Sequence, residues 1–149
     1  MARSSSYREK LYLFNDGFLL TDQLDKVIQQ LMEANNGVGA IGGSYAPGLP
    51  IQLIGNLSLT MLGYADEAEF EREQGALLLP MLCPEEGEEL TEASFEHFPE
   101  YSEHYVYTSA HEKLWVRIVK RDILQPGEPK RWLLTVCNHD AIHRHEAAL

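Results

Sequence analysis

Apolar residues recur with a helical period between residues 21 and 36. Five of them fall at positions i, i+3, i+4, i+7 and i+8, which places them on one face of an α-helix. Thr21 is suited to cap the start of this helix, and Asn36 followed by Gly37 is typical of a helix end. The apolar face consists of Leu24, Val27, Ile28, Leu31 and Met32.

This apolar face has two interpretations, and the period alone favours neither. The helix either covers the core of its own domain or joins two copies of the chain. We therefore treat the five apolar residues as candidate contacts of a homodimer. The segment before the helix, residues 1–20, mixes polar and apolar residues without a clear period. Packing of this segment on a neighbouring subunit is one interpretation, and its role stays open.

The pattern then changes from helix to strand. Residues 37–54 predict two strands joined by a turn at Pro47 and Gly48. Asn56 is expected to cap a short helix, and Gly63 is expected to end it in the left-handed conformation. Because the glycines of the first strand lie within a strand, they do not predict a phosphate-binding loop.

Further along the chain, helices are followed by strands. Asp66 is expected to begin one helix, and Pro84 to begin a longer helix that ends before Pro99. Three later runs are rich in β-branched and aromatic residues and are joined by short turns, which predicts an antiparallel meander. These runs are residues 105–108, 114–123 and 131–138.

This order of elements resembles a PAS domain, the small sensor fold of bacterial signalling proteins. The resemblance implies an α+β protein with the PAS fold: a five-stranded antiparallel sheet flanked by helices, with the N-terminal amphipathic helix outside the core. It rests on short matches whose order and spacing agree with the family. They are Pro50, Ile51, Asn56, Met61, Leu62, Gly63, Tyr64 and Phe70, then the segment 82–86, and finally Asp140.

The resemblance also implies a division of the chain. Residues 1–20 are an N-terminal segment, residues 21–36 the amphipathic helix, residues 37–140 the PAS core, and residues 141–149 the start of a C-terminal output helix. Asp140 resembles the aspartate that closes PAS cores and bonds back to the core. The resemblance therefore assigns to Asp140 the relay of a signal into the output helix.

Length and charge narrow the classes of function. The chain has 149 residues, of which 44% are hydrophobic, and this suits one domain with a core of its own. A net charge of −11 argues against binding to nucleic acid or to an anionic membrane surface. Without a long apolar run or a signal peptide, we expect a cytoplasmic protein. Cys83 and Cys137 are then expected to be reduced.

The acidic residues gather in one part of the chain. Residues 66–103 contain 13 acidic residues and one basic residue, Arg72. This stretch is either a solvated helical surface or a docking surface for a basic partner, and the first interpretation is the commoner one.

No motif of a common enzyme or metal site is present. His139, His143 and His145 lie close in sequence, but neither cysteine is placed to complete a zinc site, so no metal is expected. His97 lies in the region that supplies the haem ligand in haem-binding PAS proteins. The cysteine motif of the flavin-binding branch has no match here. The cofactor is therefore unknown, and we expect neither haem nor flavin.

The strands of the meander carry the remaining candidate ligand contacts. Alternation places their aromatic and basic side chains on particular faces, but it does not fix which face is inward. Such a face suits an anionic or aromatic ligand, and it equally suits a subunit interface. With His97, the tentative ligand-binding residues are Tyr105, Tyr107, Trp115, Arg117 and Trp132.

The resemblance implies signal reception without catalysis in this chain. The module would sense a small molecule or a partner and relay the change to an effector: a histidine kinase, a diguanylate cyclase or a transcription regulator. The alternative is a PAS module without a ligand that acts in dimerisation or another protein–protein interaction, and a filled interior would favour it. An enzyme ranks last, because no acid–base pair can be named.

Overall fold

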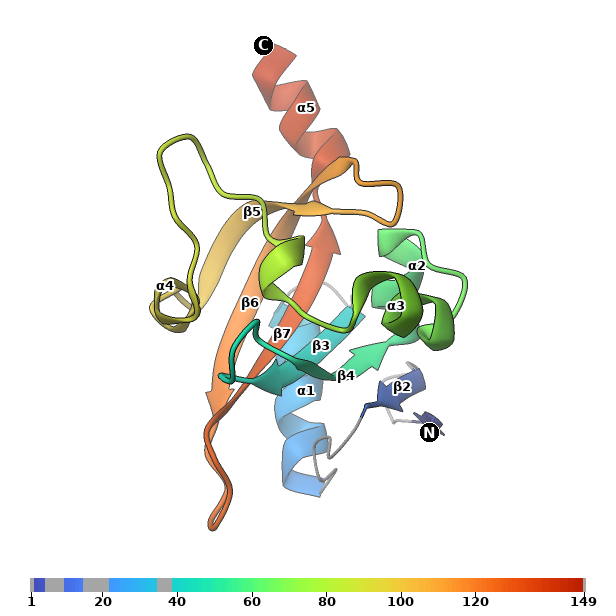
Figure 1. Cartoon of the computed structure of the whole chain (residues 1–149), viewed down its shortest axis with the longest axis vertical. Helices are drawn as coiled ribbons and strands as arrows, with labels where there is room; N and C mark the ends of the chain where they lie inside the picture. Colours follow the sequence, from blue (N-terminus) through green and yellow to red (C-terminus); the bar gives the residue numbers. More distant parts are fainter. Residues whose placement is uncertain (1, 5–9, 15–21, 35–38, 149) are drawn as a thin grey trace.

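The structure is a computed structural model of the whole chain, and it describes residues 2–4, 10–14, 22–34 and 39–148. Its centre is a seven-stranded antiparallel sheet with the strand order β1-β2-β4-β3-β7-β6-β5 (Figure 1). The strands are β1 Ala2–Ser4, β2 Lys10–Leu13, β3 Gly39–Ser44, β4 Ile51–Gly55, β5 Tyr101–Tyr107, β6 Lys113–Ile123 and β7 Arg131–Asn138.

The strand count corrects the expected five. The five strands from β3 to β7 follow the expected order along the chain, and the N-terminal segment adds β1 and β2 beside β4. Leu11 of β2 is fully buried, and Phe14 is buried in the main core. The described part of residues 1–20 therefore belongs to the chain's own sheet and core.

Asn56 connects this extension to the rest of the molecule. Its Oδ1 accepts a hydrogen bond from the backbone N–H of Lys10, at 2.8 Å. Gly55, not Asn56, occupies the capping position of the following helix, and no side chain caps that end. The expected cap is therefore wrong. Gly63 ends the helix with a φ of 87°, as expected, because glycine adopts this left-handed conformation readily.

The helix predicted between Pro84 and Pro99 is replaced by a loop and a short helix, and the helix ends predicted at Thr21 and Asn36 lie outside the described residues. The expected long helix from Pro84 is absent: residues 84–91 form a loop in which Gly87 has a φ of 81°, and helix α4 begins only after Thr91. Thr91 and Ser94 form a reciprocal capping box there. The helices are α1 Asp22–Ala34, α2 Asn56–Leu62, α3 Glu67–Gln74, the 3-10 helix η1 Leu79–Met81, α4 Glu92–Glu96 and α5 Asp140–Ala148.

The sheet separates two apolar clusters. Helices α2, α3 and α4 lie on one face, which we call the inner face, and α1 lies on the other, which we call the outer face (Figure 1). Phe70, Phe95 and Trp132 are the largest buried side chains of the inner cluster. The outer cluster joins α1 to the sheet through Leu11, Leu53, Val119, Ile123 and Leu133.

Helix α1 packs on its own chain. Ile28 and Leu31 are fully buried, Leu24 and Met32 are almost so, and Val27 packs at the margin of the same cluster. These residues were candidate dimer contacts, but their apolar surface already contributes to the monomer's core. The expectation that this helix lies outside the core is therefore wrong, because the helix forms one of the core's layers.

Two glycines of β3 explain how tightly the inner face is packed. A Cβ atom on Gly39 would lie 2.0 Å from Oγ of Ser58 in α2, and one on Gly43 would lie 2.0 Å from the carbonyl oxygen of Pro50. Ser58 is buried and donates a hydrogen bond to the carbonyl of Ala40. Glycine at these positions lets α2 and the turn after β3 approach the strand.

Candidate functional site

The interior between the sheet and the helices is nearly filled. Its cavity has a volume of about 10 Å³, which is about the space that one water molecule requires. A bound small molecule would therefore displace side chains of the core. All the lining residues are apolar: Ile41, Met61, Leu62, Leu78, Met81, Leu82, Val106, Ile118, Leu134 and Val136.

The six predicted ligand residues do not converge on this cavity. Trp132 lies on the inner face, fully buried, with its Nε1 donating to the carbonyl of Ser44 at 2.7 Å. His97 follows α4 and is exposed, with its Nδ1 2.7 Å from the carbonyl oxygen of Ala93. The side chain of His97 therefore does not lie in the interior, where a haem ligand would have to be.

The other four residues lie elsewhere. Trp115 and Arg117 alternate with the inward residues of β6 and so share the outer face with Val119, and Tyr105 pairs with Trp115. Tyr107, at the end of β5, interacts with the thiol of Cys83. The single ligand-binding group predicted from the sequence is thus divided between two faces and an edge of the sheet.

Arg117 lines a hollow of the outer face. This hollow has a volume of about 330 Å³ and is also lined by Tyr101, Ser102 and Glu103. Tyr101 keeps 58% of its surface exposed. Tyrosine and arginine are enriched in protein interfaces, whereas glutamate is depleted there.

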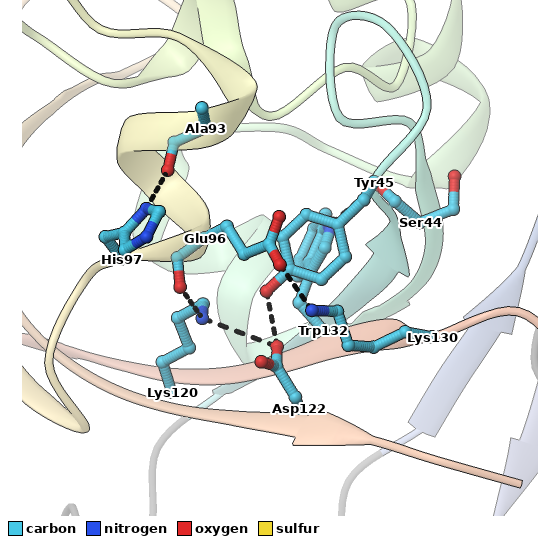
Figure 2. A network of polar contacts seen from close by, with 9 residues as sticks. All are labelled: Ser44, Tyr45, Ala93, Glu96, His97, Lys120, Asp122, Lys130 and Trp132. Atoms are coloured by element: carbon cyan, nitrogen blue, oxygen red, sulfur yellow. Dashed lines mark hydrogen bonds and ion pairs between the residues drawn. The ribbon is translucent and has the colours of Figure 1, made fainter.

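A charged cluster at the end of the inner face was not predicted. We call it the Lys120 cluster: Tyr45, Glu96, Lys120, Asp122 and Lys130. Figure 2 shows the Lys120 side chain between the carbonyl of Glu96 and the carboxylate of Asp122, at 3.3 and 3.4 Å from its Nζ. Only 6% of Lys120 is exposed. Its ammonium group also lies 5.2 Å from the ring centre of Phe95, which favours the charge in this buried place.

The same cluster joins three distant segments. The hydroxyl of Tyr45 donates to Asp122, and Lys130 pairs with Glu96 (Figure 2). Burial is the main cause that raises the pKa of Tyr45 above its ordinary value, and the hydrogen bond to Asp122 is the second. The phenol therefore remains a donor. The turn after β3, helix α4 and the β6–β7 hairpin are thereby held together.

The C-terminal helix has a defined attachment to the sheet. Oδ1 of Asp140 accepts the backbone N–H of Trp115 at 3.0 Å, and Oδ2 accepts a bond from Nε of Arg144 in the next turn. The bond from Trp115 is the main reason why the pKa of Asp140 lies below its ordinary value, and Arg144 adds to the effect. The expected bond of Asp140 to the core is present.

Aromatic contacts complete this attachment. The ring of His143 in α5 stacks on Trp115, with centres 4.0 Å apart and planes 13° apart. Tyr105 meets both rings edge-on, and Nε1 of Trp115 donates to Glu103 at 3.1 Å. No residue of α5 is buried, so the contacts of Asp140 and His143 in its first turn position the helix.

Within the described ranges, no group of three or more His, Cys, Asp or Glu residues could hold a metal ion. Nδ1 of His139 lies 3.6 Å from Oε1 of Glu103, its carbonyl accepts the backbone N–H of His143, and the two cysteines form no disulfide. None of the helices described here is long and apolar enough to cross a membrane.

The chain from β3 to β7 has the architecture of a PAS domain. Two strands, short helices and a three-stranded meander follow one another, and all five strands join in one antiparallel sheet with the helices on its inner face. The PAS fold expected from the sequence is therefore confirmed.

Comparisons with known proteins gave structural matches. No protein-family model and no curated protein matches the chain. A solved structure from a study of a flavin analogue in a light-oxygen-voltage domain is 16% identical, with a TM-score of 0.49, over 85% of this chain and 95% of that one. A sensory box histidine kinase/response regulator from Burkholderia thailandensis E264 is 16% identical, with a TM-score of 0.46, over 80% of this chain and 89% of that one.

These matches leave the cofactor of this chain untested. The flavin analogue belongs to the light-oxygen-voltage protein named above. The expectations that neither flavin nor haem binds here stay predictions.

Proposed function

We propose that this chain is the regulatory module of a bacterial signalling protein, and that it passes a change at the sheet into helix α5. The single observation that carries the proposal is the pair of hydrogen bonds that the carboxylate of Asp140 accepts. One comes from Trp115 of β6 and the other from Arg144 of α5, so Asp140 holds the strand and the helix together. A shift of β6 against the helices then changes the position of α5. Catalysis, if any, belongs to an effector such as a histidine kinase, a diguanylate cyclase or a transcription regulator.

The filled interior supports a module that works without a resident ligand. The interior has only about 10 Å³ of free space. A partner protein or a change in packing is therefore a better candidate for the input signal than a small molecule held in the core. We propose a second copy of this chain as one such partner. Tyr101 and Arg117 lie on this outer surface, and both are residue types that interfaces favour.

The relay is tested by hydrogen exchange in residues 141–148. Asp140→Ala removes both bonds of the carboxylate, so we expect faster exchange in α5 while β6 and β7 keep their protection. Glu146→Ala is the matched control, because Glu146 is an exposed residue of the same helix. Equal exchange in α5 of the wild type and Asp140→Ala would show that Asp140 does not couple the helix to the core.

A second candidate function is small-molecule sensing, and one observation favours it. The Lys120 cluster places an ammonium group among aromatic rings at the inner face, which suits an anionic aromatic ligand if α4 moves aside. Native mass spectrometry compared with the denatured mass tests this function. An adduct that disappears on denaturation supports a ligand, whereas an adduct-free protein supports the module without one.

A further inference from the structure

His104 on β5 is a histidine in an unusual environment. Its ring stacks on Phe98, with centres 4.5 Å apart and planes 9° apart. Its Nε2 is buried and has no hydrogen-bond partner among the residues that the structure describes. A neutral ring tolerates this, but a proton on Nε2 would create a buried donor without an acceptor.

The charged groups near His104 are on the loop that precedes α4. Glu88 and Glu85 both favour the protonated ring electrostatically. At present this loop is closed on itself: Oε1 of Glu88 accepts the backbone N–H of Glu85, at 3.0 Å. On the side of β6, the residue opposite His104 is Val116, which carries no charge.

The charged groups on the α4 side are engaged elsewhere. Glu96 pairs with Lys130, and the ring of His97 bonds to the carbonyl of Ala93. Lys120, on the inner face of β6, is held in the Lys120 cluster. The two glutamates of the loop are therefore the groups suited to receive a protonated His104.

The stack on His104 supports the position of α4. Phe98 also contacts Phe95, with ring centres 5.2 Å apart. Phe95 is fully buried, meets Trp132 edge-on and lies beneath the ammonium group of Lys120. Loss of the stack would thus remove one side of the packing that holds Phe95, and with it α4, on the inner face.

We propose that His104 is a proton-operated switch: on gaining a proton it leaves the stack with Phe98, pairs with Glu85 or Glu88, and releases α4 from the sheet. This inference rests on the proposed function and deepens it, because it names acidification as an input of the module. No covalent step is involved, and the proton comes from the solvent.

The direction of the pH dependence follows from burial. Desolvation lowers the pKa of His104 below its ordinary value of 6.5, so the closed arrangement binds the proton less well than the open one. The closed arrangement is fully favoured above pH 6.5 and is lost as the pH falls below it. Acidification therefore opens the α4 region.

Hydrogen exchange of the full chain tests the switch at about pH 7.5 and about pH 5.5, on either side of the ordinary histidine pKa. After correction for the intrinsic exchange rate, we expect protection of residues 91–98 to fall several-fold at the lower pH. His104→Phe can still stack on Phe98 but cannot titrate, so it should abolish this change. His97→Gln, at an exposed histidine near the same helix, should retain it.

A pH response of residues 91–98 that is the same in His104→Phe as in the wild type would overturn the inference. Because a folding defect in that variant would also alter exchange, the wild type supplies a second readout: the NMR titration of the His104 ring. Its midpoint should lie below pH 6.5 and match the midpoint of the exchange change, and a separate midpoint would also overturn the inference. Exchange in residues 141–148 at the lower pH tests the relay separately, so failure of the switch and failure of the proposed function are distinguished.

Discussion

Lys120 shows how a charged residue becomes part of a core, with the exposed Asp122 as its partner at the margin. Both point to the inner face of β6, where their neighbours in the alternation, Val116 and Ile118, are buried apolar residues. Such charges persist in a protein interior only with partners. Here Tyr45, the carbonyl of Glu96 and aromatic rings supply them.

At this scale, Tyr45→Phe is expected to lower the free energy of unfolding by about 1–2 kcal/mol, because Asp122 loses a donor and keeps its charge. Chemical denaturation measures the change. Tyr101→Phe is the matched control, since Tyr101 is 58% exposed, and it should change stability by no more than about 0.5 kcal/mol. Equal losses in the two variants would contradict the role given to the Tyr45–Asp122 bond.

Some residue roles were visible in the sequence and others were not. Gly63 and Asp66 act as expected, because the ends of helices depend on neighbouring residues only. Asn56 was misjudged because its partner, Lys10, lies 46 residues away. The Lys120 cluster was missed for the same reason: its members come from three segments that meet only in the folded chain.

Helix α1 shows the corresponding limit at the scale of elements. Its period predicted an apolar face correctly, but a period does not say what covers that face. The sheet of the same chain covers it, and Thr135 of β7 donates to the carbonyl of Leu31 at 3.1 Å. Strands β6 and β7 were predicted to within one residue because their β-branched and aromatic residues are consecutive, whereas β5 begins four residues before the predicted run.

The prediction at this scale is that Ile28→Glu destabilises the monomer. Ile28 is fully buried in the outer cluster, so a carboxylate there should lower the free energy of unfolding by about 3 kcal/mol or more. Gln29→Glu, at an exposed position of the same helix, should be nearly neutral. Thermal unfolding and gel filtration are compared: unchanged stability with a loss of dimer would restore the dimer interpretation of this helix.

At the scale of the whole molecule, the N-terminal strands were hidden from sequence analysis. β2 has four residues, too few to show an alternating pattern, and its partner β4 lies some forty residues later. The filled interior was equally hidden, because the packing of ten apolar side chains decides it. The division of the ligand candidates between the faces of the sheet was not predicted, because the sequence does not show which face is inward.

Deletion of residues 1–14 tests the contribution of these strands. It removes Leu11 and Phe14 from the two clusters and leaves β4 as an exposed strand at the end of the sheet. We expect a lower melting temperature and self-association that increases with protein concentration, measured by calorimetry and light scattering. A shortened chain as stable and as monodisperse as the full chain would show that the extension is dispensable.

The two tryptophans lie on opposite faces of the sheet, and this gives the molecule two independent optical reporters. Trp132 is fully buried beside Phe95, whereas Trp115 lies at the base of α5 beneath the ring of His143. Fluorescence from a chain that keeps only Trp132 reports on the seating of α4. Fluorescence from a chain that keeps only Trp115 reports on the attachment of α5, so the order in which the two regions respond to a stimulus can be timed in one kind of experiment.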